Sequence, residues 1–177
     1  GTMPALEGYR NQPDESITPL LKVLDAWFAK HPERANSIEI KLAGRTTDQV
    51  KEEIAASRWA SLFHILGFLE HKKVRNLIMG AQANLLMIEQ VKTAPWLFTG
   101  KVFEYIGAGR PVIMIGPDPS PLAQILRTTG LGHISGYQQP EETAEQLESL
   151  YSGGAPTLTS ENMAAIDQYN ARHQTAR

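Results

Sequence analysis

The sequence lacks cysteine, a strong net charge and any long apolar run. Without cysteine there can be no disulfides, thiolate metal sites or cysteine nucleophiles, and the chain fits a reducing compartment such as the cytoplasm. Its formal net charge of -2 offers no basic field for nucleic acid. No apolar run reaches the roughly 18 residues that span a bilayer. We therefore expect neither nucleic-acid binding nor a transmembrane segment.

Several common site motifs are also missing. There is no Gly-x-Gly-x-x-Gly fingerprint after a first strand and no Walker A motif, which argues against a dinucleotide-dependent dehydrogenase and a P-loop NTPase. The five histidines are scattered, and none has metal-ligand spacing to another histidine or a carboxylate. We expect no metal site and no bound cofactor.

What is present is a repeated alternation of short apolar strands with amphipathic helices. The pattern predicts strands at 37–43, 62–66, 83–88, 111–115 and 132–135. It predicts helices at 17–30, 47–58, 71–81, 101–109, 121–129, 141–151 and 160–172. Residues 83–88, apart from Asn84, and residues 111–115 form apolar runs, as in strands buried on both faces of a sheet.

This alternation predicts a single α/β domain over 1–177, a Rossmann-like, doubly wound and mostly parallel sheet with helices on both faces. Such sheets bind ligands beyond the carboxyl ends of their strands. The candidate site therefore lies on the loops that follow the strands, at 44–47, 67–71, 89–101 and 116–121.

One of these loops ends in Thr99-Gly100-Lys101, which opens a predicted helix. Free backbone amides and the helix dipole attract anions at such an end, and the lysine adds a positive charge. Glu104, about one turn further on, could accept hydrogen bonds from two adjacent ribose hydroxyls. The same residues are also common as a plain helix start, where an acidic side chain simply favours the dipole.

The surrounding residues add a family resemblance. The segment Lys101 to Ile113, KVFEYIGAGRPVI, resembles the donor-site signature of retaining GT-B glycosyltransferases of group 1, or family 4. Shorter matches lie at Leu42-Ala43-Gly44, Leu66 to Leu69, Ala83 to Leu86 and Gly130-Leu131-Gly132. The resemblance implies the C-terminal half of a GT-B fold. It also implies a hexosyltransferase-type enzyme, which transfers a sugar from a nucleotide-diphospho-sugar to an acceptor hydroxyl.

The family implies a role for each matching residue. Glu104 would hold the ribose hydroxyls, and Gly67, Phe68 and Leu69 would border the base, mainly through backbone groups. The diphosphate would meet Thr99, Gly100, Lys101 and Arg10. Arg45 and His71 follow strand ends and are further candidates for contact with the donor.

Two departures from the family pattern limit these implications. The first of the family's two glutamates is missing, because its position falls at Leu97, with Trp96 before it. We also expect the first strand to be absent, since Gly1-Thr2-Met3 resembles the turn that follows it in the family. We therefore expect a fragment that lacks this strand and the N-terminal acceptor domain, together with the catalytic residues that domain supplies.

Some features leave alternatives open. The cluster Lys72-Lys73-Val74-Arg75 is typical of a solvated helix face, but it could also contact an anionic membrane at its inner surface, beside a lipid-linked or glycan acceptor. Met163, Ile166 and Tyr169 share one face of the last helix. They could pack on their own domain or remain exposed for the missing one.

Three functions remain open at this stage. The first is glycosyl transfer in polysaccharide biosynthesis, with this domain holding the donor. The second is a sugar-nucleotide epimerase of the same fold. The third is a non-catalytic module that binds a nucleotide or a partner.

Overall fold

The computed structural model describes residues 2–3, 16–88, 90, 99–154 and 156–175, with side chains described for 16–88, 90, 99–154 and 156–170. The strands found within these residues are parallel and form the centre: β1 (Thr2–Met3), β2 (Ile40–Ala43), β3 (Phe63–Gly67), β4 (Asn84–Met87), β5 (Val112–Ile115) and β6 (Gly132–Ser135). Hydrogen-bonded pairing gives the orders β1-β2-β3 and β4-β5-β6. Because β1 also lies against β4, the strands follow the order 3-2-1-4-5-6 of a doubly wound Rossmann sheet.

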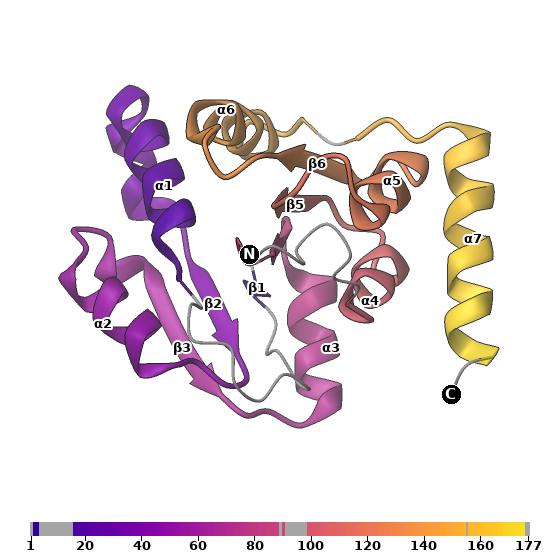
Figure 1. Cartoon of the computed structure of the whole chain (residues 1–177), viewed down its shortest axis with the longest axis horizontal. Coiled ribbons are helices and arrows are strands. Elements are labelled where there is room, and N and C mark those ends of the chain that lie inside the picture. Colours follow the sequence, from indigo (N-terminus) through magenta and orange to yellow (C-terminus); the bar gives the residue numbers. More distant parts are fainter. Residues whose placement is uncertain (1, 4–15, 89, 91–98, 155, 176–177) are drawn as a thin grey trace.

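Seven helices of the described chain surround these strands (Figure 1). They are α1 (Thr18–Lys30), α2 (Asp48–Ala56), α3 (His71–Gly80), α4 (Lys101–Gly107), α5 (Pro121–Thr128), α6 (Pro140–Tyr151) and α7 (Ser160–Thr175). Two 3-10 helices, Pro32–Ser37 and Ala60–Leu62, precede β2 and β3. Within the described residues, no helix is both long and apolar enough to cross a membrane. The predicted Rossmann-like α/β class is confirmed.

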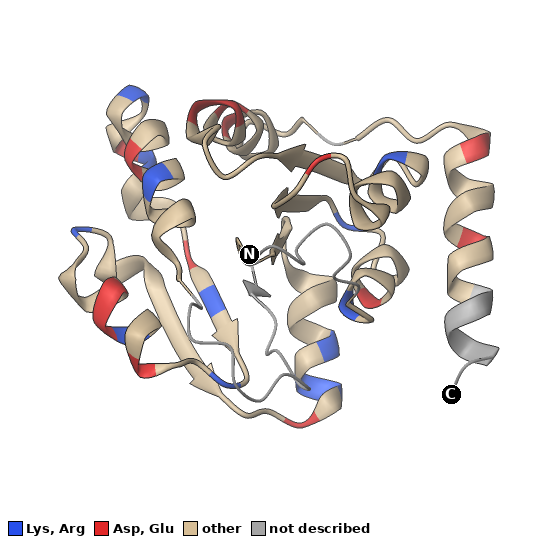
Figure 2. Ribbon diagram, viewed as in Figure 1, with Lys and Arg blue, Asp and Glu red and all other residues tan. Residues whose placement is uncertain are grey.

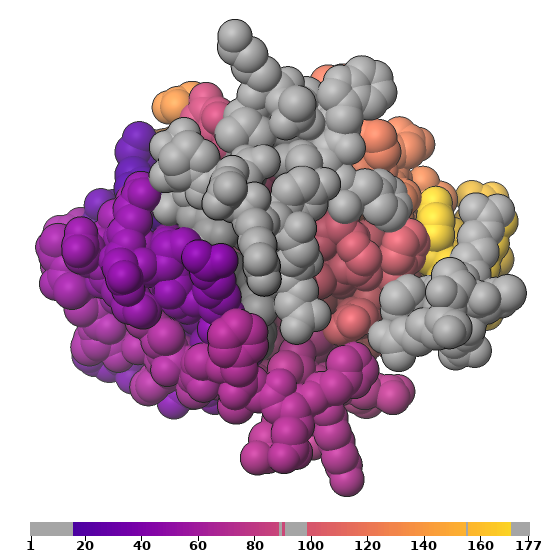
Figure 3. Space-filling model, turned by 60° about the horizontal axis from the view of Figure 1, so that its bottom comes forward, coloured from indigo at the N-terminus to yellow at the C-terminus, as the bar shows by residue number. Residues whose placement is uncertain are grey.

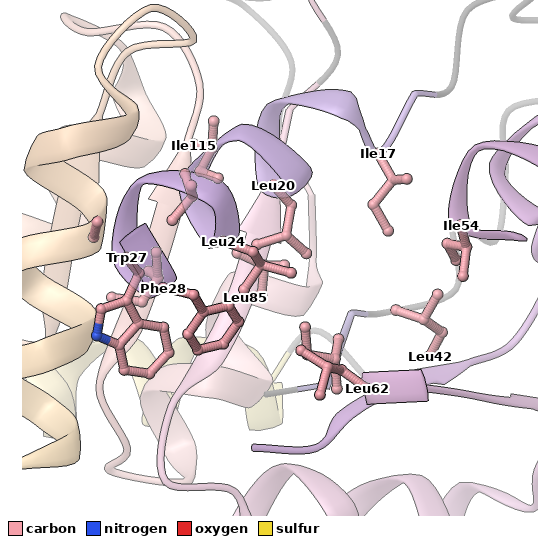
Figure 4. Packing of buried hydrophobic residues seen from close by; sticks show 14 of the residues in the cluster. Ile17, Leu20, Leu24, Trp27, Phe28, Leu42, Ile54, Leu62, Leu85 and Ile115 are labelled. Atoms are coloured by element: carbon pink, nitrogen blue, oxygen red, sulfur yellow. The ribbon is translucent and has the colours of Figure 1, made fainter. Parts of the chain in front are cut away.

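The strands at the centre bury side chains on both of their faces. Ile113 and Ile115 of β5 point into a core with α1, α2 and α6, and part of this core is seen in Figure 4. Val112 and Met114, the alternate residues of the same strand, point into a second core with α3, α4 and α5. Side chains alternate along a strand, so an apolar run such as 111–115 fits only between two helical layers.

Several element boundaries differ from the sequence-based prediction, and two of the differences concern the first strands. The strand expected from Ser37 begins at Ile40, because Ser37 ends the 3-10 helix Pro32–Ser37 and the chain then extends through Ile38 and Glu39 before the strand starts. The expectation that Gly1-Thr2-Met3 is a turn after an absent strand was wrong for Thr2 and Met3. These two residues pair in parallel with Lys41 and Leu42 and form a short first strand.

Glu148 of α6 ties that helix to α1. Its carboxylate accepts hydrogen bonds from Trp27 Nε1 at 2.9 Å, from Arg34 at 3.1 Å and from the Ser152 hydroxyl at 2.9 Å. These hydrogen bonds lower the pKa of Glu148 to about 2, and the bond from the Trp27 indole has the largest effect. The tryptophan is itself buried and stacks on Phe28 with ring centroids 5.1 Å apart.

The loops that begin at the carboxyl ends of β2 and β3 each start with a glycine in the left-handed region. Gly44 has φ 104° and Gly67 has φ 64°. The amide of Gly44 donates to the carbonyl of Gly67 at 2.6 Å, which holds the two turns side by side. Since side chains other than glycine are strained at such φ values, these positions fix how the chain leaves the sheet.

The lowered pKa of Glu148 predicts a pH-dependent contribution to stability. A carboxylate whose folded pKa is below its unfolded value stabilises the fold above the unfolded pKa, and the effect fades as pH falls from about 4.5 toward 2. The stability gap between the wild type and Glu148→Gln, measured by urea unfolding, should be constant above about pH 5 and shrink below it. Exposed Glu52→Gln serves as the control. A gap that does not change with pH would contradict this assignment.

The left-handed backbone at Gly67 predicts opposite effects of the same substitution at two glycines. A Cβ at either Gly67 or Gly80 would have no heavy atom within 4 Å, so neither change causes a clash. Gly67→Ala should destabilise by about 1 kcal/mol through backbone strain. Gly80→Ala, in the last turn of α3, should stabilise by up to about 1 kcal/mol through helix propensity. Urea unfolding of both variants measures the difference, and equal effects would show that Gly67 is not held in this conformation.

Candidate functional site

The candidate site lies at the carboxyl edge of the sheet, where α3 and α4 begin. β3 ends at Gly67, and α3 starts at His71 after three intervening residues. α4 starts at Lys101, after the loop that follows β4. Figure 3 shows this side of the molecule, where magenta α3 and rose α4 both reach the surface. The topology thus brings two of the predicted loops, 67–71 and the end of 89–101, to one edge.

The start of α4 is held firmly by its buried face. Val102, Tyr105 and Ile106 have no exposed surface and pack into the second core. Burial raises the pKa of the Tyr105 hydroxyl well above its usual value, so this side chain stays neutral. An anchored helix of this kind keeps its first backbone amides in a fixed place at the edge.

The residues at the N-terminus of α4 have properties expected of an anion site. Gly100 is the N-cap residue, and it is exposed and has no side chain with which to cap the helix. The Thr99 hydroxyl accepts a weak hydrogen bond from the Lys101 amide at 3.4 Å. Lys101 is half-buried and its ammonium nitrogen is enclosed. The positive end of a helix dipole with a cation beside it favours a negatively charged group.

Glu104 and His71 join the two helices at this edge. The Glu104 Oε1 lies 3.9 Å from the His71 Nε2, with 30% of the glutamate side chain and 66% of the histidine side chain exposed. The carboxylate is therefore accessible, but its position is defined from both helices. This contact places His71, predicted only as a further candidate, next to the residue predicted to hold the ribose.

The predicted base loop is open to solvent. Phe68 is 74% exposed, the most exposed large apolar side chain in the described chain, and Leu69 is half-buried. The space in front of Gly67 is empty to at least 4 Å. A flat base could thus approach the backbone of this loop beside an exposed aromatic ring.

Of the remaining predicted residues, only Arg45 is described by the structure. Arg45 is exposed and follows Gly44 at the end of β2, on the same edge. Arg10, predicted at the diphosphate, and Trp96 and Leu97, at the position of the missing glutamate, lie outside the described residues. In the part of the chain that the structure describes, no group of three or more acidic or histidine side chains could hold a metal.

The last helix supports α4 from outside, and sequence reasoning left this open. Tyr169 of α7 lies against Phe103 of α4, with ring centroids 5.9 Å apart, and Ile166 packs on the same core. Asn162 donates to the Thr128 carbonyl at 3.0 Å. Ile166 and Tyr169 therefore pack on their own domain, which is one of the two predicted alternatives. Met163 does not, since it is 51% exposed.

The sequence matches no known family model and no curated relative. Its structure, however, resembles solved structures of glycosyltransferases. AviGT4, a glycosyltransferase involved in avilamycin A biosynthesis, superposes with a TM-score of 0.65 at 19% identity, over 99% of this chain and 48% of that one. Anabaena HepE in complex with UDP-glucose gives a TM-score of 0.63 at 16% identity, over 99% and 47%.

A third similar structure is the α,α-trehalose 6-phosphate synthase of Burkholderia multivorans, with a TM-score of 0.62 at 11% identity, over 99% of this chain and 42% of that one. The chain thus spans less than half the length of these three proteins. At these identities the likeness concerns the fold. The chain shares the Rossmann-like architecture of part of each of these proteins.

Proposed function

We propose that this chain is the donor-binding domain of a GT-B glycosyltransferase and holds the nucleoside diphosphate part of a nucleotide-sugar. The observation that carries the proposal is the contact between Glu104 and His71, 3.9 Å apart, beside the start of α4. It joins a carboxylate, a helix N-terminus and an open loop at one edge of the sheet. Parallel sheets bind nucleotides at this edge.

The chemistry of a nucleoside diphosphate fits these groups one by one. The diphosphate would accept hydrogen bonds from the first amides of α4, next to the Lys101 ammonium. Glu104 would accept hydrogen bonds from the two ribose hydroxyls, because a carboxylate has several acceptor sites and no donor. The base would lie along Gly67, Phe68 and Leu69. Arg10 remains a proposed contact of the diphosphate.

In transfer, the bond between the sugar and the diphosphate breaks, and negative charge grows on the leaving phosphate. Amides fixed at the start of α4 and the charge of Lys101 would stabilise that leaving group electrostatically. We propose a retaining, family 4-like transferase of cytoplasmic location, whose acceptor site and catalytic groups belong to a second domain. HepE, one of the similar structures, is known in complex with UDP and with UDP-glucose, which supports a nucleotide-sugar donor.

The role of Glu104 predicts a loss of ribose recognition in Glu104→Gln. Charge-assisted hydrogen bonds contribute about 1.5–3 kcal/mol, so the affinity for the preferred one of UDP, GDP and ADP should fall by about tenfold or more. Titration calorimetry with that diphosphate and its 2′-deoxy form provides the measurement. The wild type should discriminate between the two ligands, and the variant should bind both with similar affinity.

The control for this experiment is Glu161→Gln, since Glu161 lies exposed at the start of α7, away from the carboxyl edge. This variant should keep both the affinity and the discrimination of the wild type. If Glu104→Gln still prefers the ribonucleotide as strongly as the wild type, Glu104 does not hold the ribose.

The role of Lys101 predicts a loss that depends on the phosphates. Lys101→Gln should weaken binding of the nucleoside diphosphate by about tenfold and leave binding of the nucleoside itself nearly unchanged. Affinity for the diphosphate should also depend less on salt in the variant, because one charge contact is lost. Lys72→Gln on the exposed face of α3 is the matched control. Equal losses for nucleoside and diphosphate would place Lys101 away from the phosphates.

A further inference from the structure

The N-terminus of α1 is closed by a carboxylate that comes from another helix. The Oε2 atom of Glu53, in α2, accepts hydrogen bonds from the amides of Ile17 and Thr18, at 2.8 and 3.2 Å. The same oxygen accepts the hydroxyl of Ser16 at 2.9 Å and that of Thr18 at 3.2 Å. Two amides and two hydroxyls thus converge on one oxygen, and Gln49 donates to the other oxygen at 3.1 Å.

The residues at this helix start explain why a distant carboxylate is needed. Ile17 is the N-cap residue of α1, and its apolar side chain cannot accept hydrogen bonds from the first amides of the helix. By contrast, α2 and α5 have hydroxyl caps of their own, in which Thr47 accepts the amide of Val50 and Ser120 accepts that of Ala123. The cap of α1 comes instead from a residue 36 positions further along the chain.

The capping group is an anion. Burial by itself would raise the pKa of Glu53, but the hydrogen bonds from Gln49, Ser16, Ile17 and Thr18 outweigh this effect and lower the pKa below its usual value. The positive end of the α1 dipole also favours the charged form. An anionic oxygen surrounded by amides and hydroxyls at a helix N-terminus is how proteins commonly hold a phosphate.

The place of α1 in the fold gives this cap its significance. The strand order reverses between β1 and β4, which lie side by side, and doubly wound sheets bind phosphates in the crevice at such a point. α1 follows β1 in the chain and α4 follows β4, and both helices begin at the carboxyl edge, one in each helical layer. Glu53 is in place at α1, whereas the N-cap of α4 is Gly100, which has no side chain to offer.

We propose that Glu53 is an internal substitute for phosphate, which closes an anion site at α1 and leaves α4 as the place where the diphosphate binds. The inference rests on the proposed donor-binding function. A carboxylate held beside its donors by the fold has a high local concentration, so a free phosphate must compete with it. Its charge also repels a second anion. Glu53 is therefore a positioning residue, which determines the helix that receives the diphosphate without touching the ligand.

Inorganic phosphate is the probe that tests the proposal. Glu53→Ala removes the carboxylate and leaves the donors of Ser16, Ile17 and Thr18 without it, and Thr18 is exposed, so an external anion can reach them. About 20 mM phosphate, compared with chloride at equal ionic strength, should raise the melting temperature of this variant by about 3 °C more than that of the wild type.

Two further variants of α2 serve as controls. Glu52→Ala makes the same change at the neighbouring, exposed position, and it should respond to phosphate as the wild type does. Glu53→Gln keeps an amide oxygen that can accept the same hydrogen bonds and still fills the site, so it should show no additional response either.

Lys101→Gln separates phosphate at α4 from phosphate at α1. In the wild-type background this change should abolish the response to phosphate, because α4 is then the only anion site at this edge that is open. In the double variant Glu53→Ala, Lys101→Gln, the additional response should persist, because the donors of α1 do not include Lys101. Calorimetric titration with phosphate should give the same pattern.

The outcomes distinguish this inference from the proposed donor-binding function. If Glu53→Ala responds to phosphate no more than the wild type does, or is unfolded both with and without phosphate, Glu53 is only a structural cap and the inference is overturned. A variant that folds only with phosphate present supports it. Failure of the donor-binding function would appear instead as a wild type that binds no nucleoside diphosphate, and it would leave the phosphate response of Glu53→Ala unaffected.

Discussion

The burial of β4 and β5 on both faces is the constraint on which the rest of the structure depends. Ile113 and Ile115 need one helical layer, and Val112 and Met114 need another. A strand whose successive side chains are all apolar cannot have a solvated face. This requirement places α1 and α6 on one side of the sheet and α4, α5 and α7 on the other. It also places the start of α4 at the carboxyl edge. The chain emerges from β4 at that edge, and α4 then runs back across the sheet and covers one of its faces.

The pattern of side chains was enough to predict the layers, but long-range polar contacts could not be read from it. The apolar runs at 83–88 and 111–115 predicted buried strands without any knowledge of their neighbours. Glu148 and Trp27, by contrast, are 121 residues apart in the chain. Similarly, Glu53 of α2 accepts the amide of Ile17 at the start of α1, at 2.8 Å. An acidic residue on a helix surface gives no sign of a partner so distant in sequence. Figure 2 shows how the acidic and basic residues are distributed along the helices.

The candidate site shows the same division between what is local and what is not. Gly67 and Glu104 were predicted because each belongs to a short motif with a local reason: a turn at a strand end and an acceptor in the first turn of a helix. The contact between His71 and Glu104, which brings the two loops together, depends on how α3 packs against α4. The sequence does not specify this packing. The support of α4 by Tyr169 was one of two alternatives, since an apolar stripe on a last helix does not reveal which surface covers it. Thr2 and Met3 were misjudged because two residues are too few to show a periodicity.

The two edges of the sheet have opposite chemistry for one physical reason. In a parallel sheet each strand leads into a helix at its carboxyl end, so helix N-termini with unpaired amides gather there and favour polar ligands. At the amino edge the chain arrives from helix C-termini, and α1 and α6 bring apolar side chains such as Leu24 and Leu147 over the strand starts. The carboxyl edge can therefore bind a polar ligand without help from the amino edge, and the amino edge contributes mainly to the stability of the fold.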